Sequence, residues 1–431
     1  MTSWRINATG EPLAGEFTPP GDRFGTHLAL LLGSLSVGTT RIRGAAECPE
    51  TVATRRALAH LGASFTTDDE GWLVVGRREE RLHDAEVELD VGPFVGVFEL
   101  LAGFLCGQGL AARIACHTQF PPATEAVAHL LSAAGAEVEL NLGEGIAELS
   151  TGTRPPNGFE CDIPQGRPGL KAAMLLAALG SERPCTIYEP EIGPDSCERM
   201  MKFMGVSLRR TNGTLTTGSG HRIYPRYLKI PGELTAAAPF ICAAGLIPGS
   251  DLTVTEVSAN PHRSGLLKVL AKSGLHVRRT KTWQYGSEPV SRLHVHPGDV
   301  LRPLQVPPSL APAMVDELPF VALIATQAGG ASQLRGANLL RGGMPDRAEL
   351  TLQVLRSFGA DVALEGDMLT VNGPARLFPA TVQSAGDPLT AYLAATAALL
   401  TRGETVIHGV DESADPFPGM IRDLAADVAK L

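Results

Sequence analysis

The stretch Leu28–Gly38, LALLLGSLSVG, followed by TTRI at Thr39–Ile42, decides the architecture of this 431-residue chain. Leucine and small residues fill a run of helix length, a glycine ends it, and a short β-branched segment follows. Because the same succession recurs at intervals of about 70 to 80 residues, it indicates a repeated supersecondary unit. The later copies are Glu99–Gly109, Leu170–Gly180, Phe240–Gly249, Phe320–Gly330 and Ala391–Gly403.

A second series of glycines falls between these copies, each at the end of an amphipathic run such as Thr54–Leu61 or Leu350–Phe358. Glycine in that place supplies the left-handed backbone conformation that ends many helices. Together with the short apolar segments on either side, each copy predicts the order strand–helix–strand–helix–strand–strand. The fold class that we expect is therefore α/β, with six copies of a βαβαββ unit.

The length of the chain and the placement of the copies predict two domains. A chain of 431 residues exceeds what one hydrophobic core usually supports. Three copies precede the extended segment Leu228–Gly232, and three follow it. We expect one three-repeat domain over residues 21–230 and a second built from residues 1–20 together with 231–431. Two such domains facing each other would leave an interdomain cleft, a place where ligand sites are favoured.

Composition excludes several classes of function. A formal net charge of -9 argues against a nucleic-acid-binding protein, which needs a basic face. The longest apolar runs are too short to span a bilayer, and Met1–Gly10 has no apolar signal core. The 7 cysteines form no Cys-x-x-Cys pair, and the 11 histidines show no metal-ligand spacing. We therefore expect a cytoplasmic monomer with reduced thiols, no membrane or nucleic-acid partner, no metal and no cofactor.

Several short motifs carry a resemblance to a known family. The most specific are Pro20–Arg23, Asn260–Gly265, Val315–Pro319 and Ser384–Asp387. Together they resemble the enolpyruvyl transferases of the EPSP synthase (3-phosphoshikimate 1-carboxyvinyltransferase) type over nearly the whole chain. That resemblance implies an inverse α/β barrel fold, in which two domains of three βαβαββ units close on substrate.

Several of the family's phosphoenolpyruvate- and phosphate-binding positions hold other residues in this chain. By the resemblance, Leu28 and Pro121 stand where the family has arginines, while Gly343 and Asp415 stand where it has lysines. Phosphoenolpyruvate carries about three negative charges, and burying such an anion requires several paired cations. We therefore expect that this protein does not bind phosphoenolpyruvate in the family's usual way.

Asp316 and Arg347 are the candidate catalytic residues. The resemblance places Asp316 beside the reacting hydroxyl and Arg347 on an anionic group. A carboxylate in a closed site is suited to general acid–base work. Two plainer interpretations stay open: Asp316 and Glu317 form an acidic pair at a helix start, or Arg347 pairs within its own helix with Asp346 or Glu349.

Six further residues are candidates for substrate binding: Arg23, Arg167, Lys171, Arg341, Glu99 and Asp387. Arginine and lysine would hold a carboxylate or phosphate, and Arg167 could make a new bidentate anion contact. The alternatives are structural. Arg23 and Arg167 would be solvated loop cations, Glu99 a solvated helix residue, and Asp387 a helix cap.

Three functions are compatible with this pattern. The first is an enzyme that acts on shikimate or a similar carbocyclic acid or polyol without phosphoenolpyruvate. It would be a lyase that eliminates water or phosphate, with Asp316 as acid or base, in secondary metabolism. The second is an enolpyruvyl transferase with a rebuilt donor site, and the third is a non-catalytic binding protein.

Overall fold

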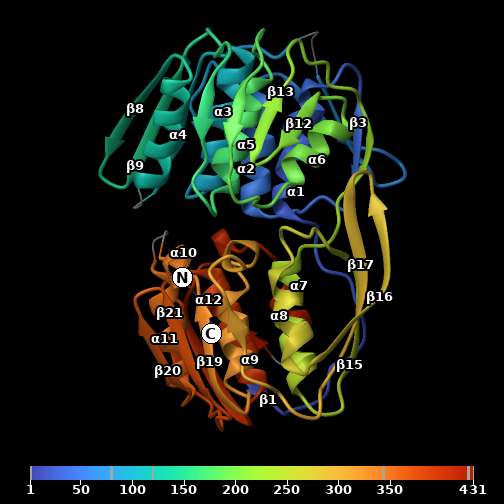
Figure 1. Cartoon of the computed structure of the whole chain (residues 1–431), viewed down its shortest axis with the longest axis vertical. Helices are drawn as coiled ribbons and strands as arrows, with labels where there is room; N and C mark the ends of the chain where they lie inside the picture. The colour runs from blue at the N-terminus through green and yellow to red at the C-terminus, as the bar shows by residue number, and fades with distance from the viewer. Residues whose placement is uncertain (1, 78–80, 119–120, 342–344, 425–427, 431) are drawn as a thin grey trace. The chain divides into compact units, whose positions relative to one another are not determined.

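The computed structural model describes residues 2–77, 81–118, 121–341, 345–424 and 428–430. It divides into two compact units, each with its own hydrophobic core. The first unit comprises Gly21–Ile230 and Gln284–Glu288, and the second comprises Met1–Pro20, Pro231–Trp283 and Pro289–Leu431. The chain thus starts in the second unit, builds the first, and returns to the second (Figure 1).

The first unit contains three four-stranded sheets in its described residues. Its helices are α1 (Arg23–Leu35), α2 (Pro49–His60), α3 (Val95–Gln108), α4 (Pro121–Ala133), α5 (Pro168–Ala178) and α6 (Ser196–Phe203). Its strands are β3 (Thr40–Arg43), β4 (Ala63–Thr67), β5 (Leu73–Arg77), β6 (Leu89–Asp90), β7 (Ala112–Cys116), β8 (Val138–Gly143), β9 (Ile146–Thr151), β10 (Glu160–Asp162), β11 (Thr186–Tyr188), β12 (Leu208–Thr211), β13 (Thr214–Thr217) and β14 (Tyr227–Lys229). The strand orders are β14-β3-β5-β4, β6-β7-β9-β8 and β10-β11-β13-β12.

The second unit repeats this plan. Its helices are α7 (Leu234–Leu246), α8 (Gly265–Ser273), α9 (Leu318–Ala325), α10 (Ala337–Leu340), α11 (Arg347–Ser357), α12 (Pro388–Leu399) and α13 (Met420–Leu424), with short 3-10 turns η1 (Ala311–Ala313) and η2 (Glu412–Ala414). Its strands are β1 (Thr2–Ala8), β2 (Ala14–Phe17), β15 (Asp251–Ser258), β16 (His276–Tyr285), β17 (Glu288–His296), β18 (Gln305–Val306), β19 (Gly330–Arg335), β20 (Asp361–Glu365), β21 (Met368–Gly373), β22 (Thr381–Gln383), β23 (Gly403–Val410) and β24 (Val428–Lys430). The sheets are β16-β17-β15-β2, β18-β19-β21-β20 and β22-β23-β1-β24.

Every sheet pairs a parallel edge strand with antiparallel neighbours. In the first unit β6 runs parallel to β7, which is antiparallel to β9. The N-terminal strands supply the same places in the second unit, where β2 runs parallel to β15 and β1 lies antiparallel to β23. The predicted α/β fold of six βαβαββ units in two halves is thereby confirmed.

Glycines let two helices of the first unit approach within backbone contact. Helices α3 and α5 lie side by side (Figure 1). A Cβ atom at Gly103 of α3 would stand 2.1 Å from the carbonyl oxygen of Ala173, and one at Gly107 would stand 2.2 Å from that of Leu176. Only glycine fits at such an approach, so these positions set the spacing of the two helices.

Three buried helices of the second unit each begin at an acidic residue. Helices α7, α9 and α12 contact one another, and their N-cap residues are Glu233, Glu317 and Asp387. Negative charge is favourable at a helix start, where backbone N–H groups lack partners. The arrangement therefore gathers carboxylates at the starts of three neighbouring helices.

The helices begin earlier than the sequence pattern indicated. The apolar run predicted from Phe240 is part of α7, which already begins at Leu234 and contains Pro239. Proline lacks an amide donor and normally disfavours a helix interior. Here Leu234 through Gly245 are all buried, so core packing outweighs that cost. In the described part of the chain, no helix combines the length and the apolar character needed to cross a membrane.

Candidate functional site

Arg347 of the second unit links two carboxylates. Asp346 caps α11 by accepting bonds from the backbone N–H groups of Ala348 and Glu349, and this cap sets Arg347 at the start of the helix. The Arg347 Nε atom donates to Asp387 Oδ1 at 2.8 Å, and its NH1 atom donates to Asp316 Oδ1 at 3.3 Å. Three residues proposed from the sequence therefore meet in one place.

Asp387 caps its helix, as one interpretation held, and it also pairs with Arg347. Its Oδ2 atom accepts hydrogen bonds from the backbone N–H of Thr390 at 2.9 Å and from the Thr390 hydroxyl at 2.6 Å, which caps α12. Its Oδ1 atom pairs with Arg347. With a side chain only 3% exposed, Asp387 fixes the guanidinium of Arg347 from the protein side.

A second arginine, Arg263, extends the network. Its NH1 atom donates to Glu317 Oε2 at 2.6 Å, and its NH2 atom donates to the hydroxyl of Thr235 at 2.8 Å. The NH2 atom also lies 3.5 Å from Asp316 Oδ2. Asp316, Glu317, Asp387, Arg263 and Arg347 together form what we call the carboxylate–arginine cluster.

Burial separates the two adjacent acids of this cluster. Glu317 is fully buried, and desolvation raises its pKa, although the neighbouring Arg263 opposes that rise. Burial by itself would lower the pKa of Arg263, but the charges of Glu317 and Asp316 raise it, so the guanidinium stays charged. The Asp316 side chain is 30% exposed. Asp316 is therefore the accessible carboxylate of the pair, held between two guanidinium groups.

Arg23, in the first unit, is also paired with an acid. It is the first residue of α1, and its NH1 atom donates to Glu50 Oε1 at 3.1 Å. The side chains of Arg23 and Glu50 are 18% and 21% exposed, so Arg23 is not a solvated loop cation. His27 Nε2 lies 4.0 Å from the same carboxylate oxygen.

Glu99 and Arg167 form another pair in the first unit. The Arg167 NH2 atom donates to Glu99 Oε1 at 2.8 Å. Glu99 is only 6% exposed, which excludes the solvated-helix interpretation. Its Oε2 atom lies against Gly169 in the first turn of α5, where negative charge is favoured. Burial raises the pKa of Glu99, and the charge and hydrogen bond of Arg167 oppose that rise.

Lys171 is satisfied inside the first unit. Its ammonium lies 2.9 Å from Glu189 Oε1, 3.0 Å from Glu198 Oε1 and 2.6 Å from the carbonyl oxygen of Pro194. An ammonium has three donors, and these three acceptors match them. Arg210 NH2 bridges the same two glutamates at 2.7 Å each. The side chain of Lys171 is 1% exposed, so this arrangement favours a structural role over substrate binding.

Arg341 is the last of the sequence candidates. Arg341 donates to the Gly366 carbonyl at 3.0 Å and lies 3.7 Å from Asp346, the residue that caps α11. Gly343, two residues further along the chain, lies outside the described residues. Asp415 is buried and accepts hydrogen bonds from the Tyr392 hydroxyl at 3.1 and 3.2 Å, so it serves as an internal acceptor.

Three residues of these ion pairs, Arg263, Glu317 and Glu50, were not among the candidate site residues. Arg263 lies in the Asn260–Gly265 motif and Glu317 lies next to Asp316, so a signal for both existed. Glu50 lies 27 residues after Arg23, and nothing in the local pattern connects the two. Among the described residues no group of three or more His, Cys, Asp or Glu side chains is arranged to hold a metal ion.

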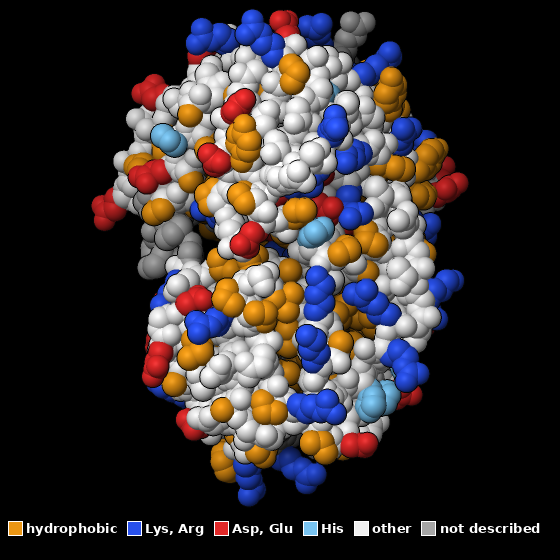
Figure 2. Space-filling view, in the orientation of Figure 1, with side chains coloured by type: hydrophobic (Ala, Val, Ile, Leu, Met, Phe, Trp, Pro, Cys, Tyr) orange, Lys and Arg blue, Asp and Glu red, His pale blue; other side chains and the backbone are white. Residues whose placement is uncertain are grey.

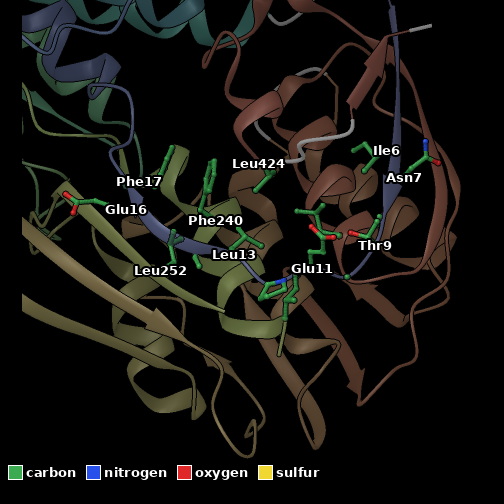
Figure 3. A pocket seen from close by; sticks show the side chains of 16 residues that line it. Ile6, Asn7, Thr9, Glu11, Leu13, Glu16, Phe17, Phe240, Leu252 and Leu424 are labelled. Carbon is green, nitrogen blue, oxygen red and sulfur yellow. The ribbon is translucent and has the colours of Figure 1, made fainter. Parts of the chain in front are cut away.

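A separate hollow in the second unit does not include the candidates. It has a volume of about 500 Å³ and lies between the N-terminal segment and the first helix of the unit (Figure 3). Phe17 and Phe240 stack within it at a centroid distance of 3.7 Å, and Glu11 and Thr9 supply polar groups. None of the eight candidate residues lines this hollow.

Lys and Arg side chains gather on a face of the second unit near α8 (Figure 2). Lys268, Lys272 and Arg279 line two hollows there. Their positions lie outside the carboxylate–arginine cluster. The candidate cations that the sequence indicated are instead the ones that carboxylates neutralise.

Comparison with known proteins agrees with the fold. The family model of EPSP synthase (3-phosphoshikimate 1-carboxyvinyltransferase) matches residues 7–424. A 3-phosphoshikimate 1-carboxyvinyltransferase of Acidithiobacillus ferrooxidans is 32% identical over 421 residues, covering 97% of this chain and 96% of that protein. One of an Anaeromyxobacter species is 33% identical over 397 residues, covering 92% and 91%.

Solved structures show the same architecture. An EPSP synthase of Acinetobacter baumannii has a TM-score of 0.88 at 24% identity, with both chains fully covered. The enolpyruvyl transferase NikO of Streptomyces tendae has a TM-score of 0.78 at 19% identity, covering 100% of this chain and 99% of that one. At these identities the likeness concerns the fold of the enolpyruvyl transferases. With the match of the family model, the chain belongs to the EPSP synthase family.

Proposed function

We propose that this protein is an enzyme that eliminates water from shikimate or a shikimate-like carbocyclic acid, without phosphoenolpyruvate. One observation carries the proposal. The guanidinium groups of Arg23, Arg167 and Arg347 lie 3.1, 2.8 and 2.8 Å from carboxylate oxygens of the chain itself. The cations on which an anionic donor would depend are therefore already neutralised.

Phosphoenolpyruvate would have to compete with those carboxylates. The carboxylate–arginine cluster holds three acids and two arginines. Bringing an anion of about three charges beside it would repel the acids, or would leave a buried acid without its partner. Each unpaired buried charge costs about 3–5 kcal/mol. A ring acid with a single negative charge meets a smaller penalty.

Asp316 supplies the proton chemistry in this proposal. Its two oxygens face Arg347 and Arg263, and its side chain is 30% exposed. The carboxylate would take a proton from a ring carbon, and the electron pair of the broken C–H bond would form a carbon–carbon double bond as the C–O bond to the neighbouring ring hydroxyl breaks. The departing oxygen leaves as water after receiving a proton from Asp316 or from solvent. Loss of phosphate from a phosphorylated ring would follow the same sequence.

Carboxyvinyl transfer is the second candidate, and the comparisons favour it. Relatives that are 31 to 33% identical over most of the chain are named 3-phosphoshikimate 1-carboxyvinyltransferase. In that reaction Asp316 would assist the acceptor hydroxyl. The donor would then need contacts other than the lysine and arginine positions at which Leu28, Pro121 and Asp415 stand. A binding protein without catalysis is the remaining possibility.

Product analysis separates these functions. The protein is incubated with shikimate, shikimate 3-phosphate and phosphoenolpyruvate, singly and in pairs, and products are identified by mass spectrometry. Loss of the mass of one water from shikimate alone supports elimination. A product that forms only in the presence of phosphoenolpyruvate shows transfer and overturns the proposal. Binding of a ring acid without any turnover supports the non-catalytic protein.

A further inference from the structure

Arg167 is the more accessible partner of its ion pair, and Glu99 is the buried one. The Arg167 side chain is 35% exposed, whereas that of Glu99 is 8% exposed. An anion in solution can therefore approach the guanidinium from the solvent side. The guanidinium is neutralised from the protein side by a carboxylate that solvent hardly reaches.

The Glu99 carboxylate occupies space that is left by the missing side chain of Gly169. The Oε2 atom lies 2.2 Å from the place where a Cβ atom of residue 169 would stand. Any side chain at that position would displace the carboxylate, and the chain has Gly169 there. Helix α3, which carries Glu99, is held against α5 at Gly103 and Gly107. Because the spacing of these two helices is set by backbone contact, the carboxylate is held beside Arg167 by the fold.

We propose that Glu99 is a built-in counter-anion that prevents Arg167 from binding a phosphate group, and that the substrate is consequently an unphosphorylated ring acid. The choice of a ring acid rests on the proposed function; the effect of Glu99 on Arg167 does not. A phosphate beside this pair would meet the negative charge of Glu99 at short range. Repulsive elements of this kind are a common source of specificity. A hydroxyl group in the same place carries no charge and is not repelled.

Removal of one charge tests this role. Glu99→Gln keeps the shape of the side chain and removes its negative charge. We expect the variant to bind inorganic phosphate about tenfold more tightly than the unaltered protein, because one repulsive charge at short range is lost. Isothermal titration calorimetry at low ionic strength measures both affinities. Glu125→Gln, on the exposed surface of α4 in the same unit, is the matched control and should leave phosphate affinity unchanged.

Two further variants make the test specific. Glu99→Gln combined with Arg167→Gln should lose the gained phosphate affinity, because the anion would be held by Arg167. Gly169→Ala keeps every charge but displaces the carboxylate, so it should also strengthen phosphate binding if Glu99→Gln does not fold. Circular dichroism establishes the folding of each variant.

Each result decides the inference. Equal phosphate affinity in the unaltered protein and in a folded Glu99→Gln or Gly169→Ala variant overturns it, as does a gain that persists without Arg167. If shikimate is turned over but the phosphate affinity of Glu99→Gln does not rise, the proposed function is upheld and the role of Glu99 is rejected. If the phosphate affinity rises but no ring acid is turned over, the role of Glu99 is upheld and the proposed function is rejected.

Discussion

Asp316 and Glu317 are neighbours in the chain, yet their carboxyl groups have different surroundings. Glu317 is fully buried and bonded to Arg263 and Thr235. Asp316 is partly exposed and lies between Arg263 and Arg347. One carboxylate is therefore enclosed in the core, whereas its neighbour in the chain is accessible.

Asp316→Asn should abolish turnover while leaving the fold intact. The amide keeps the shape but cannot accept a proton, and general acid–base groups contribute about 10²–10⁴-fold to rate. The measurement is kcat on a confirmed substrate, with circular dichroism as the check on folding. Glu349→Gln, on the exposed face of α11, is the control. Undiminished activity in Asp316→Asn would show that another group moves the proton.

Glu317→Gln should instead lower stability. It removes the closest carboxylate of Arg263, and breaking a buried ion pair costs about 3–5 kcal/mol. Urea unfolding measures the change in the free energy of unfolding, and Asp316→Asn should lose much less because its side chain is more exposed. Similar losses in the two variants would contradict the division of roles.

The stability contributed by Glu99 should depend on pH. Burial raises the pKa of Glu99 in the folded protein above 4.5, its ordinary value. Below the ordinary value the residue is protonated in both states and has no effect. As the pH rises above 4.5, Glu99 ionises in the unfolded chain before it ionises in the folded protein. The free energy of unfolding therefore falls with pH until the raised pKa of the folded protein is passed. The free energy of unfolding of Glu99→Gln minus that of the unaltered protein should therefore grow with pH, by about 1.4 kcal/mol per unit of pKa shift. Denaturation curves from pH 4.5 upward measure it, and a constant difference would show that burial does not raise this pKa.

Among the helices, the contact between α3 and α5 depends on residues without side chains. Gly103 and Gly107 allow the backbone of α3 to touch that of α5. Because the contact is between backbones, it cannot be relieved by a change of rotamer. The same contact holds Glu99 and Arg167 at a fixed separation.

Gly103→Ala should destabilise the protein by about 1–3 kcal/mol, because the added methyl group would stand 2.1 Å from the Ala173 carbonyl oxygen. Gly96 lies on the same helix and has no atom within 4 Å of an added Cβ atom. Gly96→Ala should therefore stabilise α3 by up to about 1 kcal/mol through helix propensity. Thermal unfolding compares the two, and opposite signs are expected. A neutral Gly103→Ala would show that α3 and α5 can separate without cost.

In the molecule as a whole, the chain begins in the second unit. Strand β1 pairs with β23 and β24, and β2 pairs with β15, so residues 1–20 complete two sheets of that unit. The first unit forms its three sheets without them. The two units therefore depend differently on the start of the chain.

Deletion of residues 1–20 should selectively disrupt the second unit. Without β1, strand β23 loses its antiparallel neighbour, and buried Trp4 and Ile6 leave the core. Hydrogen exchange should show lost protection in β15 and β23 and retained protection in β7 and β11. Unchanged protection of β15 and β23 would mean that the second unit folds without its N-terminal strands.

Much of the fold could be predicted from sequence, and less of the candidate site. Apolar periodicity and terminal glycines are local signals, so they identify the helices and strands within a few residues. The motif resemblance indicated Asp316, Arg347 and Asp387, which the structure brings together. It did not indicate Glu50, whose pairing with Arg23 depends on how α2 packs against α1.

The sequence by itself determined the six repeated units, because periodicity and turn chemistry act between near neighbours. Only the tertiary structure decided which charges meet. Arg347 lies 31 residues from Asp316 and 40 from Asp387, and Arg167 lies 68 from Glu99. The packing of helices in the core brings these residues, which are far apart in the sequence, into contact. Whether a cation is available for a ligand or already paired depends on that packing, because electrostatic energy depends on separation in space and on burial.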